Sequence, residues 1–590
     1  MIARRSRRSL ALCALVAALV SCQPAPDAVS TADLELDVLF EEVWADALDR
    51  SPYFRLREGL PIELLGDPSF AEYQDFAEKA RGWRARLDAL DAEALSHEDF
   101  VGARALAWDL DIAIEGERWF HHASVLTPYS SPLSGLTQIL ALVPLQSEDD
   151  AERYLALLGQ VPGFIGALES HVRDQAARGI FVWRDNFEAS AGLLQTFAAT
   201  DGRSLFAPSA PRLEGLAESI RSKVADEATA LALGDIDAAV RSLLDFLRSD
   251  DYYPQTPTEV GASALPDGAE YYRYAVRRST TMEVAPEAIH ERGLALVEEM
   301  EREMTRLRGE IGFDGSREEF RASLRTDVRY FPKSPDEVGA RLMDAAVDME
   351  KVVDDYFIGR PQAEYGVRRL EANREASLTY GIYEPPTPAD PVGRYRYNGS
   401  KLDQRAWINL RGISLHELIP GHHFHIARQA ESEDLPDYRR NMWHGAYTEG
   451  WGSYASYLGL EAGIYAGDPL SEYGMYTLEV FLATRLVVDT GMNLLGWSLE
   501  EARDFMREHT LESETQIGTE SLRYSADMPA QALAYQMGKL EILELRRRAS
   551  EALGERFDLR LFHETLLENG SLPMAVLAEH VDWWIEQQDS

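Results

Sequence analysis

Amphipathic helical patterns recur along almost the whole chain, and they constrain the fold more than any other feature. Apolar residues return every three to four positions, as expected for helices that bury one face. The clearest segments are 36–48, 70–90, 99–114, 151–177, 286–311 and 335–356. Pro286 and Pro335 each stand where a first helical turn would begin. The chain is therefore predicted to be mainly α-helical.

The helical region shows no internal boundary. No Gly/Ser-rich or Pro-rich linker interrupts the chain after about residue 32, and no internal repeat is found. With 45% hydrophobic residues, the chain can bury a large core. We expect one helical unit over 33–590, with an N-terminal lobe at about 33–320 and a second lobe at about 321–590. The exception is 365–398, where 367–370, 377–380 and 394–397 have the composition of short strands.

The N-terminus is typical of a bacterial lipoprotein signal. Four arginines, Arg4, Arg5, Arg7 and Arg8, precede an apolar run of only 11 residues that ends in Leu-Val-Ser-Cys at Cys22. That run is too short to span a bilayer. We expect residues 1–21 to be removed, Cys22 to be lipidated, and residues 22–32 to form a flexible tether. A plain secretory signal and twin-arginine export remain alternatives.

Cysteine content and charge narrow the chemistry. The chain has two cysteines, Cys13 in the signal and Cys22 at the expected anchor, so any metal must be held by nitrogen and oxygen ligands. A formal net charge of −40 excludes nucleic acid as a partner, because phosphate binding needs a basic surface. The expected location is outside the cytoplasm, tethered by lipid to a membrane, with the outer membrane facing the periplasm favoured. No feature predicts an oligomeric state.

Histidine is concentrated in one region. Five of the 13 histidines lie between residues 416 and 444, and the stretch 416–423 reads His-Glu-Leu-Ile-Pro-Gly-His-His. Neutral imidazole is a common zinc ligand, and a glutamate beside a ligand can act as a general base. His416 and Glu417 are therefore candidates for a metal ligand and a base. Apolar neighbours indicate a buried segment, where such groups need partners.

An unbroken helix cannot bring the later histidines to His416. On a helix, His422 would point about 240° away, and His423 would lie about 10 Å further along the axis. Pro420 cannot donate a backbone hydrogen bond and Gly421 tolerates unusual dihedral angles. We therefore predict a break at 419–421 that returns either His422 or His423 to the metal. Glu449, in a segment of aromatic and small residues, is the candidate third ligand.

These segments resemble a known family. The H-E-x-x-P-G-H-H run, the E-G-W segment at Glu449, and the run from Arg523-Tyr524 through Gln531 and Tyr535 to Gly538 look like a bacterial family, often on lipoproteins, catalogued as domain of unknown function eight-eight-five. That family is similar in turn to helical zinc peptidases (gluzincins) of the neurolysin, angiotensin-converting-enzyme and Taq-carboxypeptidase type. The specific part runs over 365–549, and those peptidases read H-E-x-G-H, which favours His422 as the second ligand.

The resemblance implies a two-lobed helical fold with a deep cleft and a small sheet beside it. It further implies Zn²⁺ held by His416, His422 and Glu449, and a peptide substrate attacked by water with Glu417 as base. Other roles are assigned to three sets of residues: oxyanion donors Arg523, Tyr524 and Tyr535; cleft residues Arg396, Tyr397 and Asn398; and supporting residues His444, Glu479, Asp489 and Glu520. Asn493 departs from the pattern, since many relatives are expected to carry histidine there.

Other interpretations stay open. The same centre could hydrolyse an ester or a cell-wall amide, and a binding lipoprotein could retain the motif without activity. The strands could form a surface hairpin, and the supporting residues could be ordinary interhelical pairs. A serine hydrolase is disfavoured, because no complete G-x-S-x-G elbow is found, and the segment around Ser414 does not form one.

Overall fold

The computed structural model describes residues 30–371, 375, 380–387 and 390–589. Helices dominate it, so the predicted mainly α fold is confirmed. The helices of the first half are α1 (Thr31–Arg50), α2 (Pro52–Arg57), α3 (Phe70–Asp88), α4 (His97–Trp119), α5 (Pro132–Leu142), α6 (Glu148–Ala177), α7 (Arg184–Phe197), α8 (Glu218–Leu231), α9 (Asp237–Leu247), α10 (Gly268–Thr280), α11 (Pro286–Ile311), α12 (Arg317–Thr326) and α13 (Pro335–Glu350). Those of the second half are α15 (Leu410–Glu417), α16 (His422–Glu431), α17 (Asp437–Arg440), α18 (Gly445–Glu461), α19 (Pro469–Asn493), α20 (Leu499–His509), α21 (Glu514–Leu522), α22 (Leu533–Leu553), α23 (Leu559–Leu567) and α24 (Met574–Asp589). The signal, the tether up to residue 29 and Cys22 lie outside the described residues.

The sequence located the long helices well. Each of the six predicted segments falls on a helix, and α11 has the predicted bounds. The segment predicted over 335–356 is shorter in the structure, where α13 ends at Glu350. There the N–H of Lys351 bonds to the carbonyl of Asp348, which tightens the last turn, and a separate turn follows at Val353–Asp355.

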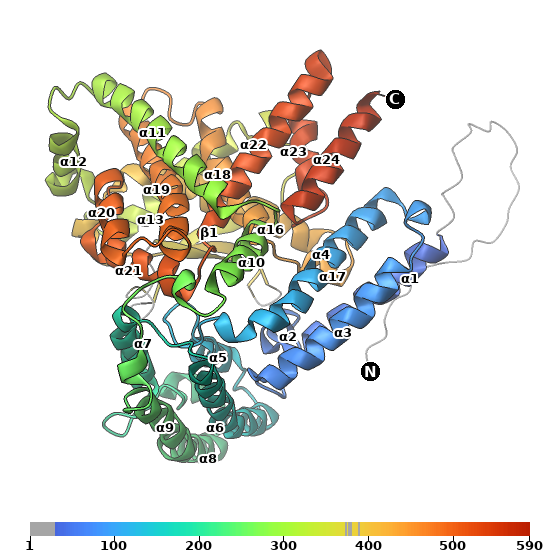
Figure 1. Cartoon of the computed structure of the whole chain (residues 1–590), viewed down its shortest axis with the longest axis vertical. Coiled ribbons are helices and arrows are strands. Elements are labelled where there is room, and N and C mark those ends of the chain that lie inside the picture. The colour runs from blue at the N-terminus through green and yellow to red at the C-terminus, as the bar shows by residue number, and fades with distance from the viewer. Residues whose placement is uncertain (1–29, 372–374, 376–379, 388–389, 590) are drawn as a thin grey trace, which may run out of the picture.

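The helices form three groups (Figure 1). Helices α1, α3 and α4 lie side by side in an arm with its own apolar core around Leu36 and Leu106. Helices α5 to α9 form a second group around Leu157 and Leu243. The largest core joins α10 and α11 to the C-terminal helices, and α11 packs along α19. Thus α10 and α11, which precede the expected lobe boundary near residue 320, pack in the same core as the C-terminal half.

A small sheet accompanies the helices. It contains β1 (Tyr365–Arg369), β2 (Gly381–Glu384) and β3 (Gly393–Tyr397), in the order β1-β3-β2. The central strand β3 runs parallel to β1 and antiparallel to β2. The first and third predicted strands are confirmed within two residues. Residues 377–379 of the second lie outside the described residues, and the strand found in that region is β2.

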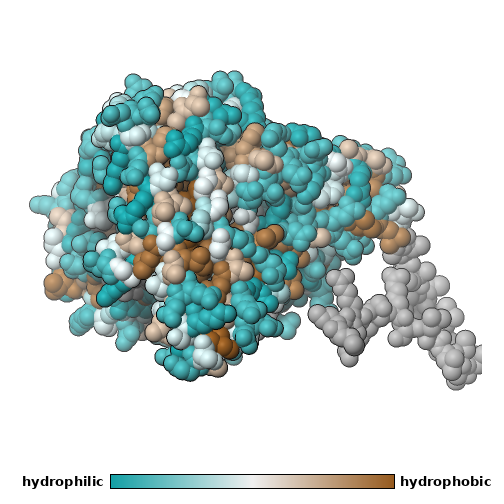
Figure 2. All heavy atoms as spheres, turned by 90° about the horizontal axis from the view of Figure 1, so that it is seen from below, coloured by the Kyte–Doolittle hydropathy of each residue, from teal (hydrophilic) through white to brown (hydrophobic). Residues whose placement is uncertain are grey.

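One face of the molecule is mainly hydrophilic. Seen from below, hydrophilic side chains cover most of the face, and apolar residues gather near its middle (Figure 2). Among the described residues, none of the helices has both the length and the apolar character needed to cross a bilayer.

Candidate metal centre

The predicted helix break lies between α15 and α16. Helix α15 ends at Glu417, the backbone leaves helical geometry at Leu418, and α16 begins at His422. The Ile419–Pro420 peptide bond is cis. At Gly421 a Cβ would lie 1.9 Å from the carbonyl oxygen of His416, so no other residue fits this turn. The two ends of the break are thereby brought together.

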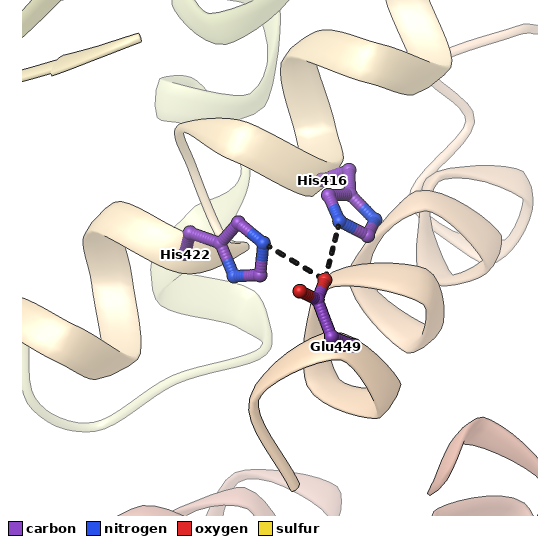
Figure 3. A group of neighbouring side chains, drawn as sticks. All are labelled: His416, His422 and Glu449. Carbon is purple, nitrogen blue, oxygen red and sulfur yellow. Dashed lines mark ion pairs between the residues drawn. The ribbon is translucent and has the colours of Figure 1, made fainter. Parts of the chain in front are cut away.

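The break places His422 beside His416. Their ring centroids are 4.6 Å apart. Glu449, from the first half of α18, points at both rings (Figure 3). Its Oε2 lies 3.6 Å from Nε2 of His416 and 3.4 Å from Nε2 of His422. These three side chains form the one group of metal-binding type found among the described residues, with ligand atoms within 4.8 Å of one another.

The arrangement suits zinc. Zinc takes imidazole and carboxylate ligands at about 2.0–2.2 Å in a tetrahedron, whose corners are then about 3.4 Å apart. The observed distances of 3.4 and 3.6 Å are close to that edge length. Burial disfavours the charged form of Glu449, but hydrogen bonding to His416 and His422 outweighs burial and lowers its pKa below the ordinary range. An ionised carboxylate with two imidazoles is a fitting donor set.

Close helix packing holds Glu449 in place. Helix α18 packs against both α15 and α22. At Gly450 an added Cβ would lie 2.5 Å from the backbone of Gly538 on α22. At Gly452 it would lie 2.8–2.9 Å from ring atoms of His416. Gly450 and Gly452, which follow Glu449, therefore create the clearance that lets α18 approach α22 and His416.

His423 points away from the cluster. Its Nδ1 bonds to the hydroxyl of Tyr383 on β2 at 2.9 Å, and its Nε2 to the carbonyl of Ala363 at 3.1 Å. Both ring nitrogens are thus engaged, one with β2 and the other with the segment before β1. Of the two alternatives that the sequence left open, only His422 lies with His416 and Glu449 in the metal-binding group.

Glu417 borders the same cavity as the metal-binding group. The cavity has a volume of about 640 Å³, and its wall includes His416, Glu417, His422, Glu449, Tyr535 and strand β2. Burial raises the pKa of Glu417 to about 7; the neighbouring His416 opposes this rise and Glu449 adds to it. The carboxyl group is thus next to the cluster and faces a space large enough for a peptide.

The three predicted oxyanion donors lie close together, but they do not all line the large cavity. The ring of Tyr535 stacks on His416 with centroids 6.1 Å apart and lines the cavity. Arg523 also lines it, from a π-helical turn at Arg523–Asp527. Tyr524 is fully buried: its hydroxyl donates to Glu520 and accepts from Nε of Arg485 at 2.7 Å. Tyr524 is therefore not among the groups that line the cavity.

The three predicted cleft residues, Arg396, Tyr397 and Asn398, are not among the residues that line the large cavity. Strand β3 is central, so its backbone is already paired on both sides. The guanidinium of Arg396 bonds to Glu371 and Glu384. Tyr397 and Asn398 line a second, smaller cavity of about 220 Å³. The strand that lines the large cavity is β2, which is an edge strand of the sheet as described.

The four predicted supporting residues divide into two pairs. Glu479 and Glu520 line the large cavity, where Glu479 pairs with the buried Lys539 and Glu520 with Arg485. His444 and Asp489 do not contact the metal-binding group. His444 bonds to Asp109 of α4 at 3.0 Å, and Asp489 accepts from the hydroxyl of Tyr272 at 2.6 Å and from the backbone N–H of Ala530.

Sequence reasoning missed three residues here. His425 lies one turn after His422 on α16 and contacts it, Nε2 to Nδ1, at 3.4 Å, so it can orient the ligand ring. The H-x-x-H spacing from His422 to His425 was the available signal. Arg485 carries no motif, and its neighbours Glu520, Tyr524 and Tyr535 come from three later elements of the chain. Tyr383 lies on β2, just after the segment 377–380 that was predicted to be a strand.

Solved structures with the same fold are known. A proposed lipoprotein from Colwellia psychrerythraea is 23% identical and matches with a TM-score of 0.85, covering 95% of this chain and 100% of its own. A proposed lipoprotein of unknown function from Shewanella oneidensis is 17% identical, with a TM-score of 0.71 and coverage of 93% and 99%. At these identities the likeness shows the fold alone. A PZ peptidase A with an inhibitor reaches a TM-score of only 0.29, so the resemblance to zinc peptidases stays a prediction.

The family assignment rests on the sequence as a whole. A comparison with curated proteins finds no match. The model of the family described as "Bacterial protein of unknown function (DUF885)" matches residues 52–581, which includes the metal-binding group and the cavity wall. The chain belongs to this DUF885 family of bacterial proteins.

Proposed function

We propose that this protein is a zinc-dependent hydrolase that cleaves peptide bonds. The observation that carries the proposal is that Nε2 of His416 and Nε2 of His422 both lie near Oε2 of Glu449, at distances close to a tetrahedral edge, on the wall of a large cavity. His416, His422 and Glu449 would hold the ion. When bound, zinc would supply a Lewis acid that polarises a carbonyl group and makes water more acidic.

Glu417 is the proposed general base. It lies beside His416 and borders the cavity, so a water molecule near the cluster would be within its reach. It would accept a proton as the water attacks the peptide carbonyl, and would then give that proton to the leaving nitrogen. The hydroxyl of Tyr535, which lines the same cavity with its ring stacked on His416, would donate a hydrogen bond to the oxygen that gains negative charge.

The protein is also proposed to work as a lipid-anchored enzyme outside the cytoplasm. The N-terminal signal with Cys22 predicts this location, and two proteins of the same fold are described as lipoproteins. The outer membrane facing the periplasm is the proposed site. Lipidation at Cys22 can be checked by mass spectrometry of the N-terminal peptide from membranes of an expressing cell.

Metal content tests the centre directly. The protein without its signal, together with His422→Ala and His423→Ala, is loaded with zinc and measured by mass spectrometry. We expect about one zinc per chain in the parent and in the His423 variant, and loss in the His422 variant. Absence of zinc from all three would favour a binding lipoprotein.

Turnover tests the reaction. A panel of peptides, simple esters and cell-wall fragments is offered to the parent and to Glu417→Gln. Peptide cleavage by the parent alone, with zinc retained in the variant, supports the proposal. A Glu417→Gln protein that cleaves peptides like the parent would refute the role of Glu417, and cleavage of esters or cell-wall amides alone would redirect the substrate class.

A further inference from the structure

A buried guanidinium group and a partly buried one lie on the cavity wall and share one carboxylate. Arg485 comes from α19 and Arg523 from the π-helical turn, and both line the cavity. Nη2 of Arg485 is 3.1 Å from Oε2 of Glu520, and Nη1 of Arg523 is 3.6 Å from Oε1 of the same residue. Within the described part of the chain, Glu520 is the only acid in ion-pair range of either arginine. The two guanidinium groups therefore share a single carboxylate as their ion-pair partner.

Other acids in this region have their own partners. Glu479 on the cavity wall is paired with Lys539. Asp527 accepts from the backbone N–H of Tyr129 at 3.3 Å, and Glu512 accepts from the hydroxyl of Tyr380 at 2.7 Å. These acids attract the two arginines only over longer distances and, among the described residues, form no ion pair with them. The positive charge of the arginines is therefore not fully balanced by Glu520, and a further anionic group could balance it.

Arg523 also has unused hydrogen-bonding capacity. Its Nη2 donates to Oε1 of Gln531 at 2.5 Å, but its Nε is buried and has no partner among the described residues. A buried donor of a charged group that lacks an acceptor is unfavourable. A carboxylate can accept two parallel hydrogen bonds from a guanidinium, and is therefore a better acceptor for Arg523 than a neutral group is.

The arginines lie at a suitable distance from the metal-binding group. The ring of Tyr535 is close to both sites: its centroid lies 6.1 Å from the ring centroid of His416 and 4.8 Å from the guanidinium carbon of Arg485. A residue in an extended peptide spans about 3.3–3.6 Å. A carboxylate one or two residues beyond a carbonyl held near His416 would therefore reach Arg485 and Arg523.

Other residues that line the cavity are apolar and exposed. Trp443, Tyr53 and Ile382 line the cavity and are 59%, 51% and 42% exposed. Exposed apolar side chains at a cavity are typical of a binding surface. The remainder of a bound peptide would lie across this rim, with its charged end inside.

We propose that Arg485 and Arg523 bind the C-terminal carboxylate of the peptide substrate, so that the enzyme removes one or two residues from the carboxyl end of apolar peptides. This inference rests on the proposed function, and it assigns Arg523 to substrate binding in place of oxyanion stabilisation. It also means that the overall acidity of the protein does not select cationic substrates at this site.

Binding and cleavage are tested separately. The probes are N-acetyl-Ala-Phe-Phe with a free carboxylate, the same peptide with a C-terminal amide, and an amidated peptide with an internal glutamate. Calorimetry on the zinc-loaded Glu417→Gln protein gives their affinities, and repetition after chelation removes any direct carboxylate–zinc contact. Arg523→Gln removes one guanidinium, Arg523→Lys restores the charge, and Arg440→Gln is the matched control, because Arg440 lines the same cavity but pairs with Asp437.

We expect the free acid to bind at least about tenfold more tightly than the amide, a difference of about 1.4 kcal/mol. The preference should fall to within about twofold in Arg523→Gln, recover in part in Arg523→Lys, and persist in Arg440→Gln and without zinc. Equal affinity of the zinc-loaded Glu417→Gln protein for acid and amide would overturn the inference even if the protein that also carries Arg523→Gln fails to fold. Tight binding of the amidated glutamate peptide would overturn the C-terminal assignment. A preference for the acid without zinc binding or turnover would refute only the proposed function.

Discussion

Adding one methyl group at Gly452 should separate zinc binding from folding. A Cβ at this position would lie 2.8–2.9 Å from three ring atoms of His416. Ordinary contact between such atoms needs about 3.5 Å, so the ring must move by roughly 0.7 Å. The ring ends a rotatable side chain, and alanine favours a helix over glycine by about 1 kcal/mol. The fold of Gly452→Ala should therefore survive.

The metal site should not tolerate that movement. Zinc sites hold their ligand distances to about 0.2 Å. A displacement of roughly 0.7 Å would remove His416 from a set of three proposed ligand residues. Even mutation of a residue that only orients a ligand typically lowers metal affinity by about 10- to 100-fold. We take a 10-fold loss, about 1.4 kcal/mol, as the smallest effect consistent with the geometry.

Competition with a fluorescent zinc chelator measures the affinity, and circular dichroism with thermal unfolding measures the fold. Gly445→Ala is the matched control on the same helix, since its Cβ would meet its nearest neighbours at 3.6 and 3.7 Å, ordinary contact distances. It should bind zinc like the parent. If folded Gly452→Ala keeps the parental zinc affinity, His416 is not a ligand in the position described, and the reasoning fails.

Three further results are expected. Tyr535→Phe keeps the ring that stacks on His416 but loses the hydroxyl, so kcat should fall by about 10²- to 10³-fold with zinc content unchanged; an unaltered kcat would exclude Tyr535 as an oxyanion donor. Burial raises the pKa of Asp489 to about 7, so its contribution to stability is lost as pH rises from about 4 to about 7. The melting temperature of the parent should therefore drop more between pH 5 and pH 8 than that of Asp489→Asn, and equal drops would contradict the shift. Zinc at 100 times its Kd should stabilise the fold by about 2.7 kcal/mol, so chelation should lower the melting temperature of the parent but not of Glu449→Ala.

Local chemistry made the helices and the break predictable. Helical periodicity located α11, and the Pro420–Gly421 dipeptide located the end of α15, because both depend on residues close in sequence. Partners distant in the chain were not predictable in the same way. Nothing near His444 indicates that it bonds to Asp109, and nothing near Asp489 indicates Tyr272. Such pairs are set by how helices pack, which a single sequence does not encode locally.

The choice between His422 and His423 shows where a motif stops being informative. Both are histidines after the same break, and consecutive residues on a helix point about 100° apart, so only the direction in which α16 leaves the break can separate them. That direction depends on Gly421, where the backbone passes within contact distance of the His416 carbonyl. Glu449 depends on clearance in the same way, since Gly450 and Gly452 let α18 approach α22 and His416. Gly421, Gly450 and Gly452 therefore define the proposed centre as much as the proposed ligands do, because they set how closely the helices that carry those ligands approach one another.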